Sequence, residues 1–195
     1  MTSLETTDGV TLGYRVQGSG PPLLFVHGWM TSGDLWSPTL ATLADRFTCV
    51  VPDLRGTGAS SSDTADYSLQ RQAKDLVELL DHLDLHDVVV VGHSMGGPIA
   101  CGVAIGAPAR VRCLVLTNPV PFDGLDLPDE IVALFRTSAG NRDKQGAILD
   151  AASPHLHDDE RTRLLDVAGP IPEPCIVGAF DAWTGGAFGE RAAEI

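Results

Sequence analysis

Basic residues are scarce in this chain of 195 residues, because 13 lysines and arginines stand against 26 aspartates and glutamates. The formal net charge of −13 makes the surface repel phosphate backbones and anionic lipids. Nucleic acid and membrane surfaces are therefore not expected as partners. Hydrophobic residues make up 44% of the chain, which is typical of a globular domain and excludes a disordered chain. A chain of this length predicts one domain with a core of its own.

Cysteine is also scarce, and the four cysteines are far apart and form no C-x-x-C pair: Cys49, Cys101, Cys113 and Cys175. This spacing argues against both a disulfide framework and a metal site, so no metal or other cofactor is expected. The first three lie in apolar surroundings, where a thiol behaves as a small hydrophobic side chain. We expect these three thiols to be buried.

Targeting and membrane-spanning segments are missing as well. Residues 1–5 contain no basic region followed by an apolar one, so no secretory signal peptide is recognised. The most apolar stretch, residues 88–108, contains His93, Ser94 and Pro98. It fits a buried strand, a turn and a helix better than a bilayer span. The sequence therefore predicts a soluble, cytoplasmic protein.

Short apolar runs alternate with helical patterns through the first 118 residues. Residues 10–16 alternate apolar and polar side chains, which predicts a half-exposed antiparallel strand. Four continuous apolar runs predict strands that are covered on both faces: residues 23–26, 47–51, 88–91 and 111–116. Helical spacing of apolar residues is clear over 68–83 and weaker over 36–44. Buried strands separated by helices predict an α/β fold with a mostly parallel sheet flanked by helices.

Prolines punctuate the rest of the chain, and no continuous strand-like run follows Pro119. Short helices are predicted there, for example over residues 129–136 and 158–167. We therefore expect residues 1–118 to form the core and residues 119–195 to form a helical cap segment above the sheet.

The strongest chemical signal is the sequence G-H-S-M-G-G at residues 92–97, between the strand predicted at 88–91 and a helical stretch. This G-x-S-x-G pattern predicts a sharp turn that presents the hydroxyl of Ser94 as a nucleophile. Gly92 and Gly96 allow strand and helix to approach closely, because neither carries a Cβ. The N–H groups at the start of the helix favour negative charge beside Ser94. A serine in an ordinary buried turn is the alternative.

A second loop, H-G-W at residues 27–29, follows the strand predicted at 23–26. Such a loop fits a position beside the nucleophile. One of its backbone N–H groups would then bind an oxyanion together with the N–H of Met95. A simple strand-ending turn is the alternative.

Together with D-L-R-G-T-G-A-S at residues 53–60, these motifs resemble the α/β-hydrolase superfamily in order and spacing, and within it the aryl-esterase and non-haem haloperoxidase branch. The resemblance covers residues 12–118 closely, and the tail resembles the helical cap of that superfamily. It implies that Ser94 is the catalytic nucleophile and that Trp29 and Met95 supply the oxyanion hole. Asp53 and Arg55 are interpreted as structural, because paired charges in a glycine-rich loop usually fix its conformation.

A general base and an acid are missing from the positions that this resemblance implies. The histidines after Ser94 are His155 and His157, which lie in a polar stretch of the cap segment and are interpreted as solvent-exposed. The strand predicted at 111–116 is followed by Asn118, where some relatives carry a carboxylate. We expect a C-terminally incomplete chain that lacks the last strands of the fold. A short relative that binds without catalysis is the alternative.

The predicted function is hydrolysis of a small-molecule carboxylic ester through an acyl-enzyme on Ser94. Peptidase, C–C hydrolase, thioesterase and perhydrolase activities are alternatives, because they use the same serine constellation. A non-catalytic binding protein of the same fold is the alternative from another class. Six large apolar residues after Pro119 fit either an acyl pocket or packing within the cap: Leu125, Leu127, Ile131, Leu134, Phe135 and Trp183.

Overall fold

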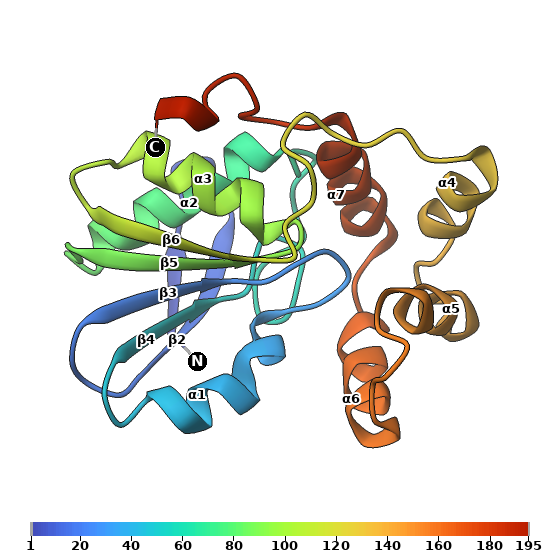
Figure 1. The fold of residues 1–195 in the computed structure, drawn as a ribbon, viewed down its shortest axis with the longest axis horizontal. Helices are drawn as coiled ribbons and strands as arrows, with labels where there is room; N and C mark the ends of the chain where they lie inside the picture. The colour runs from blue at the N-terminus through green and yellow to red at the C-terminus, as the bar shows by residue number, and fades with distance from the viewer. Residues whose placement is uncertain (1, 195) are drawn as a thin grey trace.

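The computed structural model describes residues 2–194 and contains one six-stranded sheet with the order β1-β2-β4-β3-β5-β6 (Figure 1). The strands are β1 (Thr2–Glu5), β2 (Thr11–Gln17), β3 (Pro22–Val26), β4 (Thr48–Pro52), β5 (Val88–His93) and β6 (Val111–Thr117). Strands β3 to β6 run parallel, whereas β1 and β2 form an antiparallel edge. The five predicted strands and the mostly parallel α/β sheet are confirmed, and β1 is an additional strand.

Helices cover both faces of the sheet (Figure 1). On one face, α2 (Leu69–His82) and α3 (Gly96–Gly106) pack against each other and over the larger hydrophobic core. On the other face, η1 (Gly33–Trp36) and α1 (Ser37–Leu43) cover a smaller core around Phe25, Trp36 and Leu40. The helix predicted weakly at 36–44 is therefore confirmed by η1 and α1.

The amphipathic pattern at residues 68–83 forms α2 as predicted. Ser68 caps its N-terminus, because the Ser68 hydroxyl accepts a hydrogen bond from the backbone N–H of Arg71 at 3.2 Å. Leu69, Leu76 and Leu80 are fully buried within the larger core. Each buried leucine stabilises the fold by about 2 kcal/mol relative to an exposed one. This apolar face therefore holds α2 against the sheet.

Four helices follow β6 in the described chain, and we call them the cap helices: α4 (Asp129–Arg136), α5 (Arg142–Ala152), α6 (Asp158–Ala168) and α7 (Glu173–Gly185). They stand beyond the end of the sheet at which the parallel strands terminate, and α7 lies nearer to the strands than α4 and α5 (Figure 1). A short helix, η2 (Ala192–Glu194), follows α7. The helices predicted at 129–136 and 158–167 are confirmed by α4 and α6, whereas α5 and α7 were not predicted.

The prediction that residues 111–116 form a strand covered on both faces is wrong. Within residues 2–194, β6 is the last strand of the sheet and pairs only with β5. Its Cys113 and Val115 are exposed. The predicted burial of Cys113 is therefore also wrong, whereas Cys49 and Cys101 are buried as predicted. An apolar run predicts a strand but does not reveal whether another element covers it, and here the Cys113 face of β6 is left uncovered.

No helix formed by residues 2–194 is long and apolar enough to cross a membrane. Over the same part of the chain, histidine, cysteine, aspartate and glutamate side chains form no group of three or more that could hold a metal ion.

Candidate functional site

Ser94 lies in the turn that joins β5 to α3, as the G-x-S-x-G pattern predicts. Its φ of +54° is in the left-handed region, which a residue with a side chain adopts only at an energetic cost. Backbone hydrogen bonds hold this conformation. The N–H of Ser94 donates to the carbonyl of Thr117 at 3.1 Å, and the carbonyl of Ser94 accepts from Gly97 and Val120 at 2.9 and 3.2 Å. Within residues 2–194 the Ser94 hydroxyl itself has no hydrogen-bond partner.

Two glycines allow the close approach of strand and helix at this turn. A Cβ on Gly92 would lie 2.4 Å from the carbonyl oxygen of Gly96. A Cβ on Gly96 would lie 2.4 Å from the carbonyl oxygen of Val26. Because a real side chain cannot occupy either position, α3 can begin directly against the ends of β5 and β3 only with glycine at both. The N-terminus of α3 therefore lies beside Ser94.

The H-G-W loop lies against the same turn. A Cβ on Gly28 would be 3.0 Å from the Cβ of Ser94, and Trp29 is the next residue. Met95 follows Ser94 at the start of α3 and is buried. Within residues 2–194 the backbone N–H groups of Trp29 and Met95 donate to no other residue. The structure thus brings the loop that contains Trp29 next to Ser94 and Met95, and both N–H groups are unpaired among residues 2–194.

His27 fixes the H-G-W loop from inside the core. Its Nδ1–H donates to the carbonyl of Gly28 at 2.8 Å, and its Nε2 accepts from the N–H of Leu54 at 2.9 Å. Because a backbone N–H can donate only to an unprotonated nitrogen, the ring proton is assigned to Nδ1 and the ring is neutral. Burial lowers the pKa of His27 to about 4, which keeps the ring neutral at pH 7. His27 is therefore engaged on both nitrogens and positions the loop.

Three other histidines lie next to Ser94 or after it in the chain, and none of them hydrogen-bonds its hydroxyl: His93, His155 and His157. His93 lies edge-on to Trp36 with ring centroids 6.4 Å apart, and burial lowers the pKa of His93. His155 and His157 are exposed before α6, as predicted. Among residues 2–194, no histidine hydrogen-bonds the Ser94 hydroxyl, and Asn118 is exposed.

Left-handed backbone conformations gather at this edge of the sheet. Met30, Ser94 and Asn118 have φ angles of +59°, +54° and +47°, although none is a glycine. They follow β3, β5 and β6, three parallel strands that end at the same edge. Strained backbone of this kind is typical of functional sites, and ligands of parallel α/β sheets bind at the carboxyl ends of the strands.

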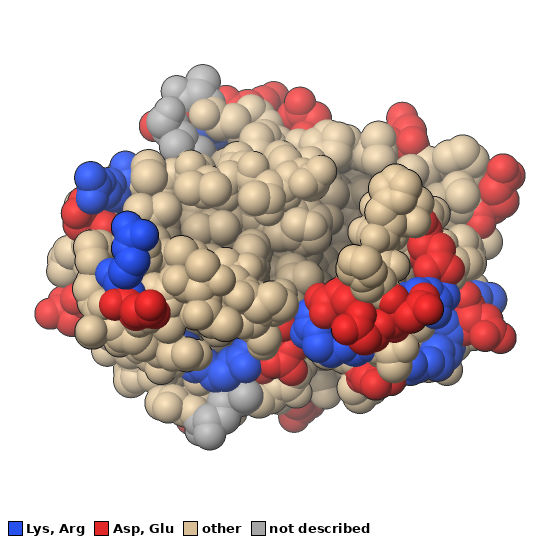
Figure 2. Space-filling model, turned by 60° about the horizontal axis from the view of Figure 1, so that its bottom comes forward, with Lys and Arg blue, Asp and Glu red and all other residues tan. Residues whose placement is uncertain are grey.

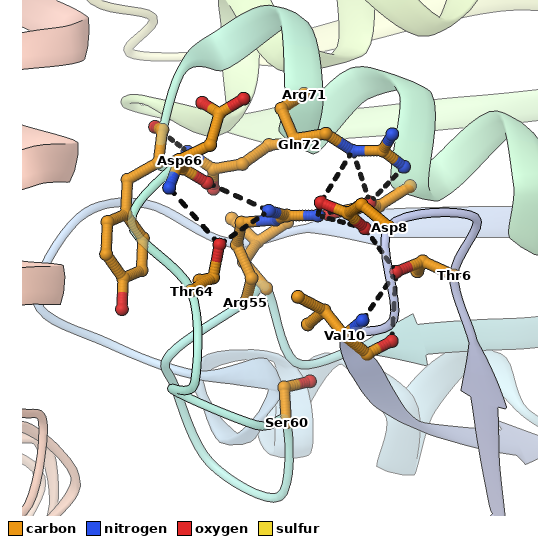
Figure 3. A network of polar contacts seen from close by, with 12 residues as sticks. Thr6, Asp8, Val10, Arg55, Ser60, Thr64, Asp66, Arg71 and Gln72 are labelled. Atoms are coloured by element: carbon orange, nitrogen blue, oxygen red, sulfur yellow. Dashed lines mark hydrogen bonds and ion pairs between the residues drawn. The ribbon is translucent and has the colours of Figure 1, made fainter.

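A buried ion-pair network holds the loop that follows β4 (Figure 3). The guanidinium of Arg55 is fully buried and donates to both carboxylate oxygens of Asp75, at 2.7 and 2.8 Å. It also pairs at 3.0 Å with Asp8, in the turn between β1 and β2. Arg71 pairs with Asp75 at 2.6 Å and with Glu78 at 2.7 Å. Each charged group has partners of opposite sign, which supports the structural interpretation of Arg55.

Asp53 has a similar structural role in the same loop. Its carboxylate accepts hydrogen bonds from the backbone N–H groups of Gly33 at 2.7 Å and Ala59 at 2.9 Å. A Cβ on Gly58 would lie 2.3 Å from the carboxylate carbon, so the loop closes tightly around this group. The carboxylate of Asp53 thus holds two backbone segments together through hydrogen bonds, which supports the structural interpretation of Asp53 as well.

The side chain of Trp29 contacts two of the cap helices. Its Nε1–H donates to the carbonyl of Ile176 in α7 at 2.8 Å. The indole stacks on Phe135 of α4, with ring centroids 5.0 Å apart and an interplanar angle of 16°. The ring of Phe180 in α7 lies 6.1 Å away from the indole. The aromatic residue of the H-G-W loop is therefore packed between α4 and α7.

Phe135 and Trp183 are two of the six apolar residues that fit either an acyl pocket or packing within the cap. In the structure both pack within the cap. Phe135 lies 5.3 Å from Phe180 and 6.2 Å from Trp183, between ring centroids. Sequence reasoning missed Phe180 and Ile176 because α7 was not predicted. The signal for α7 was present, since prolines at positions 172 and 174 precede apolar residues that recur three or four positions apart.

One face of the molecule has few charged side chains and is hollowed between the sheet and the cap helices (Figure 2). The densest group of charged side chains lies outside the hollow (Figure 2). Among the cap helices, α5 and α6 carry the ion pairs of Arg161 with Asp150 and of Arg163 with Glu160. The hollow therefore offers a surface with few charged side chains between the sheet and the cap helices.

Two curated proteins share about two fifths of their residues with the matched part of this chain. An uncharacterised protein of Mycobacterium bovis is 40% identical over 114 residues, which are 58% of this chain and 33% of that protein. The non-heme chloroperoxidase CPO-A1 of Kitasatospora aureofaciens is 39% identical over 123 residues, which are 62% of this chain and 45% of that protein. The chain thus spans less than half the length of these relatives.

A solved structure extends the similarity to the whole chain, and a family model covers the part that contains the site motifs. A hydrolase from Pseudomonas aeruginosa PA01 matches 100% of this chain and 76% of its own, with a TM-score of 0.85 and 28% identity. A family model described as the alpha/beta hydrolase fold matches residues 21–155. That match includes the H-G-W loop, the loop after β4 and the turn at Ser94, and it covers more than half of the chain. The chain therefore belongs to the α/β-hydrolase family.

Proposed function

We propose that this chain carries the nucleophile of a serine hydrolase that cleaves carboxylic esters through an acyl-enzyme on Ser94. The turn at Ser94 is the observation that carries the proposal. Its left-handed serine lies beside Gly28, and the N–H groups of Trp29 and Met95 are unpaired within residues 2–194. A hydroxyl at this position favours acyl transfer over epoxide or haloalkane chemistry, for which this fold uses a carboxylate nucleophile.

The proposed reaction has two steps. The Oγ of Ser94 attacks the acyl carbon, its proton passes to a general base, and the carbonyl oxygen becomes an oxyanion. The N–H groups of Trp29 and Met95 stabilise that oxyanion, which a helix N-terminus beside Ser94 also favours. The tetrahedral intermediate collapses with loss of the protonated alcohol or phenol. Water then attacks the acyl-enzyme and releases the carboxylic acid and the free hydroxyl of Ser94.

The general base is assigned to none of the described residues. Within residues 2–194 the Ser94 hydroxyl has no hydrogen-bond partner, and His27 is fully engaged elsewhere. Oxyanion donors and binding alone retain about 10³–10⁴-fold catalysis over water when a member of the triad is missing. We therefore expect slow acylation of the 195-residue chain and still slower release of the acyl group.

An uncharged ester is the substrate class that the surface favours. The hollow in Figure 2 has few charged side chains, and the net charge of −13 disfavours anionic substrates. The similarity to a hydrolase from Pseudomonas aeruginosa PA01 supports hydrolysis as the type of reaction. A small aryl ester with a good leaving group is the sharpest probe, because its acylation step needs the least help from an acid.

The test is acylation of the 195-residue chain by p-nitrophenyl acetate. Release of p-nitrophenolate gives the rate, and peptide mass spectrometry locates the acetyl group. We expect a stoichiometric burst with the acetyl group on Ser94, and loss of both in Ser94→Ala. The matched control is Ser153→Ala, because Ser153 is an exposed serine at the end of α5.

Two outcomes would overturn this proposal. Equal release by wild type and Ser94→Ala would show that Ser94 is not the nucleophile. Binding of the ester without any covalent adduct would favour a non-catalytic binding protein instead. The double variant His155→Ala/His157→Ala is expected to acylate as the wild type does, because both side chains are exposed and hydrogen-bond nothing near Ser94.

A further inference from the structure

The indole of Trp29 joins the H-G-W loop to a helix 147 residues further along the chain. The Nε1–H of Trp29 donates to the carbonyl of Ile176 at 2.8 Å, and the ring is stacked on Phe135. A stacked ring with one directed hydrogen bond has little rotational freedom. The two contacts therefore define where the side chain of Trp29 lies relative to α4 and α7.

The other end of the same residue is held by the core. The Nδ1–H of His27 donates to the carbonyl of Gly28, which belongs to the same peptide unit as the N–H of Trp29. Because that unit is planar and trans, fixing the carbonyl of Gly28 also fixes the direction of the Trp29 N–H. The peptide is thus held between His27 on the core side and the indole contacts on the cap side.

The space behind this peptide is nearly filled. A cavity of about 10 Å³ is bordered by the H-G-W loop, by Met95 and by residues of α7 that include Cys175, Ile176 and Ala179. This volume holds about one water molecule at most. Trp29 and Met95, the residues of both proposed oxyanion donors, therefore border the same small cavity as α7. A displacement of α7 would change the packing around both residues.

We propose that Trp29 is a positioning residue. Through the contacts of its indole, the positions of α4 and α7 determine the direction of the backbone N–H of Trp29. This inference rests on the proposed function for its catalytic consequence. The cap helices then contribute to the acylation rate without touching the ester, because they orient a donor to the oxyanion. A misplacement of about 1 Å at such a group costs up to about 10²-fold in rate.

The test compares two tryptophan-to-phenylalanine variants of the 195-residue chain. Trp29→Phe keeps an aromatic ring beside Phe135 but removes the N–H that bonds Ile176. Trp183→Phe is the matched control, because the buried Nε1 of Trp183 has no hydrogen-bond partner among residues 2–194. We expect Trp29→Phe to lower the maximal rate of Ser94 acylation about tenfold or more at an unchanged half-saturating ester concentration. Trp183→Phe is expected to stay within about twofold of wild type.

A second readout is independent of activity. In ¹H–¹⁵N spectra, Phe135→Leu is expected to shift the backbone amide resonances of Trp29 and Met95, because it removes the stacking partner on α4. Equal acylation by the two variants together with unmoved amide resonances in Phe135→Leu would overturn the inference. If the wild type is not acylated at Ser94, the proposed function fails, and the amide resonances alone decide whether the cap positions the loop.

Discussion

A Cβ on Gly28 would lie 3.0 Å from the Cβ of Ser94 and 3.2 Å from Nδ1 of His93. There is therefore no space for a side chain at position 28 of the H-G-W loop on the side of the nucleophile. We predict that Gly28→Ala lowers the rate of Ser94 acylation at least about tenfold, because the added methyl displaces the loop that carries the Trp29 N–H. Its overpacking is expected to cost about 1–3 kcal/mol of unfolding free energy.

The control for Gly28→Ala is Gly185→Ala. A Cβ on Gly185 would meet nothing within 4 Å, and its φ is outside the left-handed region. Acylation assays and urea unfolding of both variants check the prediction. Unchanged acylation in Gly28→Ala would mean that the loop does not take part in the chemistry.

The neutral, buried ring of His27 predicts a loss of stability in mild acid. Burial lowers the pKa of His27 to about 4, whereas an unfolded chain has an ordinary histidine pKa of about 6.5. Below about pH 6.5 the unfolded state binds the proton and the folded state does not, so the unfolding free energy falls until about pH 4. Across that window the contribution is about 3 kcal/mol.

Urea unfolding between pH 7 and pH 4 measures this slope. His27→Asn is expected to be less stable at pH 7 and to have a flatter pH dependence over the same window. The matched control is His155→Asn, which replaces an exposed histidine. Identical slopes in His27→Asn and wild type would contradict the assignment.

Breaking the network around Arg55 is expected to destabilise the fold strongly. Arg55→Ala leaves Asp75, which is 1% exposed, without its bidentate partner. Removal of one partner from a buried ion pair typically costs about 3–5 kcal/mol. Because Arg71 still pairs with Asp75, we expect a cost at the lower end of this range. The exposed pair of Arg112 with Asp87 provides the contrast, and Arg112→Ala is expected to leave the unfolding midpoint unchanged. Chemical denaturation of Arg55→Ala and Arg112→Ala measures both unfolding midpoints. Equal midpoints would contradict the structural role of Arg55.

One thiol of the native chain is expected to react with an aromatic disulfide reagent. Cys113 is exposed, whereas Cys49, Cys101 and Cys175 are buried. Burial also raises the pKa of the Cys175 thiol to about 12, so little thiolate forms there at neutral pH. Rapid labelling should therefore be stoichiometric with one thiol and should disappear in Cys113→Ser. Fast labelling of several thiols in the native state would show that the core opens readily.

Local patterns in the sequence predicted the parts of the site that one segment determines. The turn at Ser94 needed only an apolar run, two glycines and a helical stretch, because strand, turn and helix are consecutive. The helix at residues 68–83 was predictable from its spacing of buried leucines for the same reason. These elements depend on neighbours in the chain, and a single sequence contains that information.

Contacts between distant segments were not predictable in this way. Nothing local indicates that Arg55 pairs with Asp8, or that Trp29 reaches Ile176, because each pair depends on how separate elements pack. The exposure of Cys113 was missed for a related reason, since the number of strands beside β6 is a property of the whole sheet. β1 is short and carries exposed residues, so its apolar signal is weak.

Met30, Ser94 and Asn118 have a left-handed backbone at one edge of the sheet. At Ser94 this strain lowers the stability of the fold, although the same residue carries the proposed reactive hydroxyl. Glycine adopts this backbone without the steric cost of a Cβ, so Ser94→Gly relieves strain and removes the proposed nucleophile in one step. A selection for thermal tolerance alone would therefore reward loss of the reactive hydroxyl. Directed evolution of this scaffold needs a chemical screen alongside the thermal one, because the strained backbone position of Ser94 is also the position of the proposed nucleophile.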